Sequence, residues 1–208
     1  RLGVDTAHPL ITRGPLSVTV EALGSVPRGM ALGRGGAAPG DRILVTGTLG
    51  DAGLALAADS AAMSQQIRAF LQMRLARPEP RVAAGIALRG LASAAIDISD
   101  GLVADLGHIL TASGRGARLM VDDLPLSHVL AEELPRERAL ELALSSGDDY
   151  ELCFTAAPDA LAEVDDRLQS LECRVTPIGT VTATGGGLQC LRADGSRLAP
   201  APGYRHFP

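Results

Sequence analysis

Aromatic residues are scarce in this sequence. Phe, Tyr and Trp together make up 2% of the 208 residues, and tryptophan is absent. A hydrophobic core must therefore be built from Leu, Val, Ile and Ala, with small residues such as the 24 glycines allowing close packing. Because 46% of the residues are hydrophobic and 21% are charged, the composition is that of an ordinary globular protein and argues against intrinsic disorder.

Cysteines are few, and long apolar runs are missing. Cys153, Cys173 and Cys190 are odd in number and widely spaced in strand-like runs, so we expect buried core thiols in a reducing compartment rather than disulfides. Apolar stretches such as residues 54–58 are far shorter than the roughly 20 residues of a membrane-spanning helix. The first residues lack the layout of a signal peptide. These features predict a cytoplasmic location and no membrane association.

Positive charge is in deficit. The sequence has 19 Lys and Arg residues against 24 Asp and Glu residues, which gives a net charge of −5. Binding to a nucleic-acid backbone requires clustered Lys and Arg, so no nucleic-acid partner is expected. An anionic ligand would have to be held locally, by a metal ion, by backbone N–H groups or by single arginines.

Strand-like and helix-like segments mix along the chain. Residues 15–23 alternate apolar and polar side chains with the period of a half-buried strand. Further strands are expected at 42–46, 94–98, 117–121, 150–155 and 174–179, with a terminal hairpin over 187–196. Helices are expected at 52–58, 61–75, 81–91, 100–111, 134–142 (with Pro135 in its first turn) and 159–171. The order lacks a strict β-α-β rhythm, which favours the α+β class, with a mixed sheet covered by helices.

An acidic segment follows the strand expected at 94–98. Ser99 or Asp100 is well placed to cap the next helix, because a side-chain oxygen there accepts a hydrogen bond from an unpaired backbone N–H. A cap does not explain Asp97, which stands between Ile96 and Ile98 in an apolar strand. A buried carboxylate requires a cation or hydrogen-bond donors to offset its transfer from water. The segment is therefore either a helix cap or a metal or phosphate site, with the two alternatives equally weighted.

Two other segments have both a structural and a functional interpretation. Residues 147–151 supply three carboxylates ahead of a strand, and they form either a solvated turn or part of a shared divalent-cation site. Arg34 is flanked by glycines and is either a bidentate phosphate ligand or a surface arginine. The glycine-containing loop at 47–51 lacks the ending of a Walker A motif, so a tight strand-to-helix turn is the favoured interpretation.

Six segments, taken together and in order, resemble the thiamine-monophosphate kinase family of the aminoimidazole-ribonucleotide-synthetase-like superfamily. The segments are TRGPLS (12–17), GDRILVTGTLGD (40–51), RPEPR (77–81), AIDISDGLVADLGH (95–108), LSSGDDYEL (144–152) and GYRHF (203–207). The resemblance implies that residues 25–208 form the C-terminal α+β domain of that fold. It also implies that residues 1–24 are the remnant of an N-terminal ATP- and metal-binding domain, most of which this chain does not contain.

The same resemblance implies an activity and a set of site residues. The activity is ATP-dependent phosphorylation of thiamine monophosphate to thiamine diphosphate, with Mg²⁺ as cofactor and a homodimer as the expected assembly. Asp148 stands where the family pattern has a Glu, one methylene longer. By resemblance the Mg²⁺ ligands are Asp97, Asp100 and Asp5, the ATP contacts are Arg34, Ser99 and Asp5, and the substrate contacts are Asp148 and Tyr204.

The expected mechanism is in-line transfer between two anions, so the main tasks are positioning and charge neutralisation. A phosphate acceptor is already ionised at neutral pH, and no side chain is assigned as a general base. Two alternatives stay open: another ATP-using enzyme of the same superfamily, or a non-catalytic ligand-binding fragment.

Overall fold

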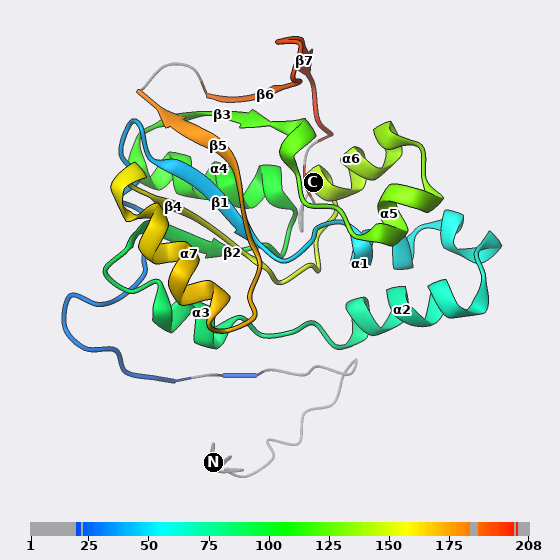
Figure 1. The fold of residues 1–208 in the computed structure, drawn as a ribbon, viewed down its shortest axis with the longest axis horizontal. Helices are drawn as coiled ribbons and strands as arrows, with labels where there is room; N and C mark the ends of the chain where they lie inside the picture. The colour runs from blue at the N-terminus through cyan, green and yellow to red at the C-terminus, as the bar shows by residue number, and fades with distance from the viewer. Residues whose placement is uncertain (1–19, 22, 184–186, 202, 204–208) are drawn as a thin grey trace, which may run out of the picture.

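The fold is known from a computed structural model that describes residues 20–21, 23–183, 187–201 and 203 (Figure 1). The strands are β1 (Arg42–Thr46), β2 (Ala92–Asp97), β3 (Gly116–Met120), β4 (Leu152–Ala156), β5 (Val175–Thr182), β6 (Leu188–Leu191) and β7 (Arg197–Leu198). The α-helices are α1 (Asp51–Leu56), α2 (Gln65–Ala76), α3 (Val82–Ala87), α4 (Leu102–Ser113), α5 (His128–Glu133), α6 (Arg136–Ser145) and α7 (Leu161–Gln169). Short 3-10 helices are η1 (Ala58–Ala62), η2 (Val121–Asp123) and η3 (Pro158–Ala160).

The strands form one mixed sheet in the order β2-β4-β1-β5-β3-β6-β7. Neighbouring strands pair antiparallel, except β3 and β6, which pair parallel. The strand β2 lies at one edge and pairs with β4 alone among the strands. The sheet and its covering helices confirm the predicted α+β class.

Helices cover both faces of the sheet because the strand residues alternate between two cores (Figure 1). In the central strand β1, Ile43 and Val45 pack in the core beneath α4 and α6. Leu44 points to the opposite face and packs with Phe154 in the core beneath α3 and α7. Both faces of β1 are therefore buried, which explains its continuous apolar sequence.

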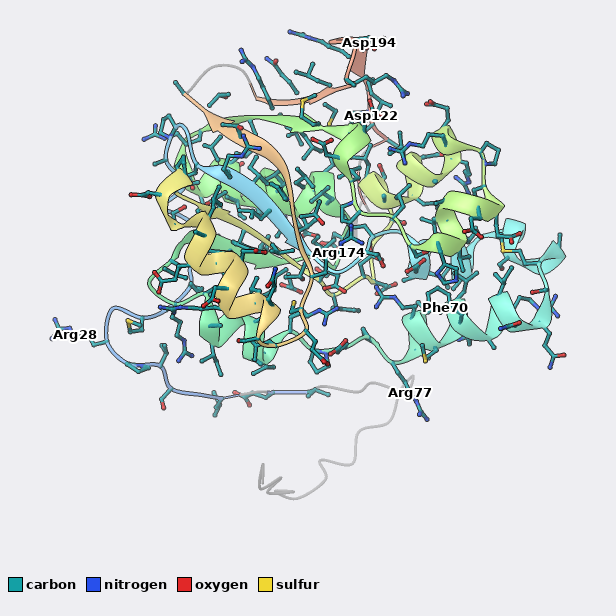
Figure 2. The ribbon with its side chains drawn as sticks, in the orientation of Figure 1. Arg28, Phe70, Arg77, Asp122, Arg174 and Asp194 are labelled. Carbon is teal, nitrogen blue, oxygen red and sulfur yellow. The ribbon has the colours of Figure 1, made fainter. Side chains whose placement is uncertain are left out.

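A third core joins α1, α2, α5 and α6 beside the sheet, around Leu54, Leu71 and Leu130. Figure 2 shows Phe70 on α2 directed toward α5, where its ring centroid lies 5.5 Å from that of His128. This helical group borders the loops that follow β1 and β2, and it forms one wall of the site described below.

Most predicted elements are present, with informative differences. The helix predicted at 81–91 ends at Ala87 in α3, because the chain turns through Gly90 at φ 79° to enter β2. Pro135 is the N-cap of α6 rather than part of its first turn. Helix α5 was missed; it has six residues, too few to show a clear period, and Ser127 caps it by accepting a hydrogen bond from Leu130 N–H.

Other expectations concern the cysteines, the termini and the membrane. Cys153, Cys173 and Cys190 are buried and free, which confirms that they are core thiols. The strand predicted at 15–23 lies largely outside the described residues, and the division at residue 24 stays a prediction. Among the described residues, every helix is too short or too polar to cross a membrane.

Candidate active site

The loop between β2 and α4 is organised by a carboxylate that the sequence did not single out. Asp105, in the first turn of α4, is buried, and its Oδ2 accepts hydrogen bonds from Ser99 N–H at 2.9 Å and Asp100 N–H at 3.0 Å. The N-cap residue is Gly101, at φ 107°, and its helix has no side-chain cap. The alternative in which Ser99 or Asp100 caps α4 is therefore wrong, because Asp105 accepts hydrogen bonds from the backbone of both residues.

Burial affects the protonation of this carboxylate. Removal from water raises the pKa of Asp105, and the two backbone hydrogen bonds oppose that rise. The loop thus depends on a buried acceptor, while the side chains of Ser99 and Asp100 line a cavity.

Asp97 is exposed, which corrects the argument that burial obliges it to bind a cation. It is the last residue of β2, opposite Leu152 of β4. Because β2 is an edge strand and Asp97 lies at its end, water solvates a side chain whose sequence neighbours, Ile96 and Ile98, are buried. The alternation of side chains across a strand separates Asp97 from those neighbours.

The second acidic segment, residues 147–151, lies directly against the loop between β2 and α4. Asp148 N–H donates to Ser99 O at 3.0 Å, and Tyr150 N–H donates to Ile98 O at 2.8 Å. A Cβ added to Gly147 would lie 2.0 Å from Ser99 O, so only glycine permits the two backbones to approach this closely. The structure therefore brings together the two acidic segments that the sequence places about fifty residues apart.

Both Asp148 and Tyr150 have left-handed backbone conformations, at φ 64° and φ 51°. Such angles are uncommon for a tyrosine, and here the surrounding backbone hydrogen bonds hold them in place. The Tyr150 hydroxyl donates to Asp148 Oδ1 at 3.1 Å. That hydrogen bond raises the pKa of Tyr150, and burial and the charges of Asp148, Asp97 and Asp100 raise it further. Three carboxylates thus act on one phenol.

A cavity of about 720 Å³ opens between α1, the loop after β2 and the loop before β4. Ser145, which lines this cavity, donates its hydroxyl to Ala201 O at 2.7 Å. The residues that line the cavity are Gly53, Leu56, Ser99, Asp100, Ser145, Ser146, Gly147, Asp148, Tyr150 and Gly203. Three predicted site residues, Ser99, Asp100 and Asp148, therefore share one cavity.

A second cavity, of about 480 Å³, lies on the other side of Tyr150. Asp97 and Tyr150 contribute to its wall, and Tyr150 lines both cavities. The other lining residues are Pro78, Pro80, Arg81, Val82, Gly85 and Leu152.

The remaining predicted residues lie apart from these cavities or outside the described chain. Asp5 and Tyr204 are outside the described residues. Arg34 is exposed in the segment that lies against the edge strand β2, where Ala95 N–H donates to Gly33 O at 2.9 Å. Within the described part of the chain, no group of three His, Cys, Asp or Glu side chains is arranged to hold a metal ion.

Glu151 is buried in an ionic cluster that sequence reasoning missed. Its side chain is 1% exposed, and Oε2 accepts from Thr46 Oγ1 at 2.6 Å and from Arg81 Nε at 2.6 Å. Arg81 Nη2 donates to Oε1 at 2.7 Å, and Arg74 Nη2 lies 3.6 Å from the same oxygen. The interpretation of residues 147–151 as a solvated turn is therefore wrong for Glu151, which is neutralised by two arginines.

Asp149 is also buried, with 5% exposure, and it binds the glycine loop after β1. Gly50 N–H donates to both of its carboxylate oxygens at 3.0 Å. Burial raises the pKa of Asp149 to about 8, with the charge of Asp51 adding to the rise. Gly50 N–H is thus bound by the carboxyl group of Asp149, which supports the structural interpretation of residues 47–51 as a tight turn.

Comparison with known proteins relates this arrangement to a family. Residues 38–190 match the family described as AIR synthase related protein, C-terminal domain. The chain is 47% identical over 209 aligned residues to the thiamine-monophosphate kinase of Salmonella typhimurium, and 48% identical over 210 to that of Escherichia coli K12. Each alignment covers 99% of this chain and 63% of the relative, so the chain spans less than two thirds of these relatives.

Solved structures show the same similarity. A thiamine-monophosphate kinase from Stenotrophomonas maltophilia K279a superposes with a TM-score of 0.74 at 45% identity, covering 83% of this chain and 56% of that one. A structure described as AaThiL complexed with AMPPCP and TMP superposes with a TM-score of 0.68 at 35% identity. That superposition covers 85% of this chain and 54% of the other.

Proposed function

The chain belongs to the family of AIR synthase related proteins, C-terminal domain, and on this premise we propose that the protein phosphorylates thiamine monophosphate with ATP. The product is thiamine diphosphate. The observation that carries the proposal is the convergence of Ser99, Asp100 and Asp148 on one cavity, from loops that backbone hydrogen bonds join. The similarity to relatives named thiamine-monophosphate kinase selects this reaction among ATP-using activities.

The ligands bound in a related structure support the choice of ATP and thiamine monophosphate as the two reactants. AMPPCP is an ATP analogue, and in a kinase of this name TMP denotes thiamine monophosphate. By this proposal Ser99 and Arg34 contact ATP, while Asp148 and Tyr204 contact the thiamine phosphate. The segment that carries Arg34 lies against β2, where Ala95 N–H donates to Gly33 O, and Asp97 is two residues further along that strand.

Mg²⁺ fits the donors that this chain supplies. Asp97 and Asp100 offer hard carboxylate oxygens on either side of Tyr150, and Mg²⁺ is commonly bound by one or two carboxylates together with substrate phosphates. We propose these two residues, with Asp5, as its ligands. When bound, the ion would neutralise the phosphate charges that otherwise repel one another.

The side chains of this chain act mainly by positioning. A phosphate acceptor carries its own negative oxygen at neutral pH, so the proposed reaction needs no side chain to remove a proton. The backbone hydrogen bonds from Asp148 and Tyr150 to the loop after β2 fix the position of the proposed substrate residue Asp148 relative to the proposed metal ligand Asp100. We also propose a cytoplasmic homodimer, as the resemblance implies.

The decisive experiment measures ADP release by the complete protein with ATP, Mg²⁺ and thiamine monophosphate. We expect turnover that depends on thiamine monophosphate and that falls by about a hundredfold or more in Asp97→Asn. Asp159→Asn serves as the matched control, because Asp159 is exposed on η3 and lines neither cavity. Absence of thiamine-phosphate-dependent turnover in the unmodified complete protein would refute the proposed function.

A further inference from the structure

A buried side chain connects two walls of the cavity of about 720 Å³. One wall is α1, and another is the loop before β4, which contributes Asp148 and Tyr150. Asp149, between these two loop residues, is 5% exposed. Gly50, directly before α1, donates its N–H to Oδ1 and Oδ2 of Asp149, each at 3.0 Å. This hydrogen bonding therefore joins the residues that adjoin both walls.

The wall formed by α1 is packed tightly against its neighbours. A Cβ added to Gly50 would lie 2.8 Å from Leu130 Cδ2 and 2.9 Å from Ala143 N. A Cβ added to Gly53 would lie 2.1 Å from Ser146 Oγ. Such close contacts require glycine, and they hold α1 directly against α5 and α6. The N–H of Gly50 is therefore a fixed donor, and a side chain that binds it takes a fixed position.

The carboxylate of Asp148 lies at the surface and depends on its backbone for its direction. It accepts a hydrogen bond from the Tyr150 hydroxyl, which is itself exposed. The φ angles of 64° and 51° at Asp148 and Tyr150 direct both side chains to the cavity, while Asp149 between them points inward. Left-handed angles at such residues persist only where surrounding contacts impose them. The hydrogen bonding of Asp149 to Gly50 is a contact of this kind.

The groups around Asp149 favour its neutral form. Asp51 of α1, Arg74 of α2 and Glu151 before β4 act on it through their charges. Arg74 lies 3.3 Å from Asp51 Oδ2 and 3.6 Å from Glu151 Oε1, so its charge is shared between those two carboxylates. Burial raises the pKa of Asp149 to about 8, against the opposing effects of the Gly50 hydrogen bond and Arg74. At neutral pH an asparagine therefore reproduces both the shape and the charge of this side chain.

We propose that Asp149 is a positioning residue: by binding Gly50 N–H it sets the direction of the neighbouring Asp148 carboxylate, and through it the affinity for thiamine monophosphate. Asp149 is buried and lines neither cavity, so it acts without touching the substrate. The inference rests on the proposed function for the identity of that substrate. It assigns the effect to a hydrogen-bond acceptor rather than to a negative charge.

The test is steady-state ADP release by the complete protein, with ATP and thiamine monophosphate varied in turn. Asp149→Ala removes the acceptor, and we expect the KM for thiamine monophosphate to rise by about tenfold, with kcat and the KM for ATP changed by less than about twofold. Asp149→Asn keeps an oxygen that accepts from Gly50 N–H, so it should recover most of the lost affinity. Equal KM values in Asp149→Ala and the unmodified protein would overturn the inference and leave the proposed function intact.

A double replacement tests whether Asp149 acts through Asp148. Independent tenfold effects multiply, so Asp148→Asn combined with Asp149→Ala would raise the KM for thiamine monophosphate by roughly a hundredfold. If Asp149 acts only by directing the Asp148 carboxylate, the double variant should resemble Asp148→Asn alone. A multiplied effect would contradict the inference.

Two further variants separate this role from a general loss of stability. Val164→Ala truncates a fully buried side chain in the core beneath α3 and α7 that lines neither cavity of the candidate site, so it lowers stability and should leave both KM values unchanged. Asp149→Leu has a similar size and no acceptor. It should behave like Asp149→Ala, and it takes the place of that variant if the alanine protein does not fold.

Amide hydrogen exchange tests the same contact without turnover. The N–H groups of Asp148 and Tyr150, which donate to the loop after β2, should exchange faster in Asp149→Ala than in Val164→Ala. In Asp149→Asn they should exchange at the rate of the unmodified protein. Unchanged exchange in Asp149→Ala would overturn the inference, whereas missing thiamine-phosphate-dependent turnover in the unmodified protein refutes the proposed function.

Discussion

Arg81 and Glu151 are joined by two parallel hydrogen bonds, from Nε to Oε2 at 2.6 Å and from Nη2 to Oε1 at 2.7 Å. Arg81 belongs to the link between α2 and α3, and Glu151 immediately precedes β4. This geometry is the bidentate pairing that a planar guanidinium makes with a carboxylate. The pair fixes the link to the sheet next to Tyr150, where both cavities meet.

Loss of this pair should destabilise the protein strongly. Arg81→Met leaves the buried Glu151 carboxylate with a weaker partner in Arg74, and we expect the free energy of unfolding to fall by about 3 kcal/mol. Arg77→Met is the control, since Figure 2 shows Arg77 directed away from the fold. Urea denaturation followed by circular dichroism measures both. Equal stability of the two variants would show that the pair contributes nothing net.

Gly47 should tolerate no side chain. Its φ is 59°, and an added Cβ would lie 2.1 Å from Glu151 Oε1, which Arg81 holds in place. We expect Gly47→Ala to lower the free energy of unfolding by at least about 2 kcal/mol. Gly114→Ala has nearly the same angle, 63°, with open space around its Cβ, so its cost should be limited to about 1 kcal/mol of backbone strain. Comparable thermal denaturation of the two variants would contradict this account.

Asp149 should make stability depend on pH. Its pKa is about 8 in the folded protein against 3.8 when unfolded, so between these values the folded state binds more protons. The free energy of unfolding contributed by Asp149 is therefore fully present below about pH 4 and is lost as pH rises toward 8. Asp149→Asn keeps an acceptor for Gly50 N–H and should flatten the decline in urea midpoint between pH 5 and 8. An Asp149→Asn variant with the slope of the unmodified protein would refute this assignment, and Asp159→Asn should keep that slope.

Asp105 should hold the loop after β2. Asp105→Ala leaves the N–H groups of Ser99 and Asp100 without their acceptor, at a cost of about 2 kcal/mol. Amide hydrogen exchange at these two positions should accelerate in the alanine variant. In Asp105→Asn the side-chain carbonyl still accepts, so protection should be largely kept. Unchanged exchange in Asp105→Ala would show that the loop is held by other contacts.

Asp148 should bind the substrate through its charge. Asp148→Asn suits the left-handed angle of 64°, because asparagine adopts that region readily, and it removes the negative charge. We expect the KM for thiamine monophosphate to rise by about tenfold while the KM for ATP stays the same. Tyr150→Phe removes the hydroxyl that donates to Asp148 and should give a smaller rise. An unchanged KM in Asp148→Asn would remove Asp148 from the substrate site.

Local patterns in the sequence were enough for the class and for most elements. The run of residues 42–46 forms a strand, and Leu102, Leu106 and Ile109 form the buried face of α4, because spacing along the chain decides which side chains share a face. The proximity of the two acidic segments agrees with one of the two alternatives that the sequence left open, the shared site. The short helix α5 was not predicted, because its six residues are too few to show a helical period.

The sequence by itself determined the α+β class, the core thiols and the family resemblance, all of which depend on composition, periodicity or the order of motifs. Only the tertiary structure decided which carboxylates are buried. Asp97 is exposed because its strand lies at the sheet edge, whereas Glu151 is buried because Arg81, 70 residues away, binds it. The solvation and pKa of a charged group depend on the neighbours that sheet pairing and helix packing bring to it, and those neighbours are distant in sequence.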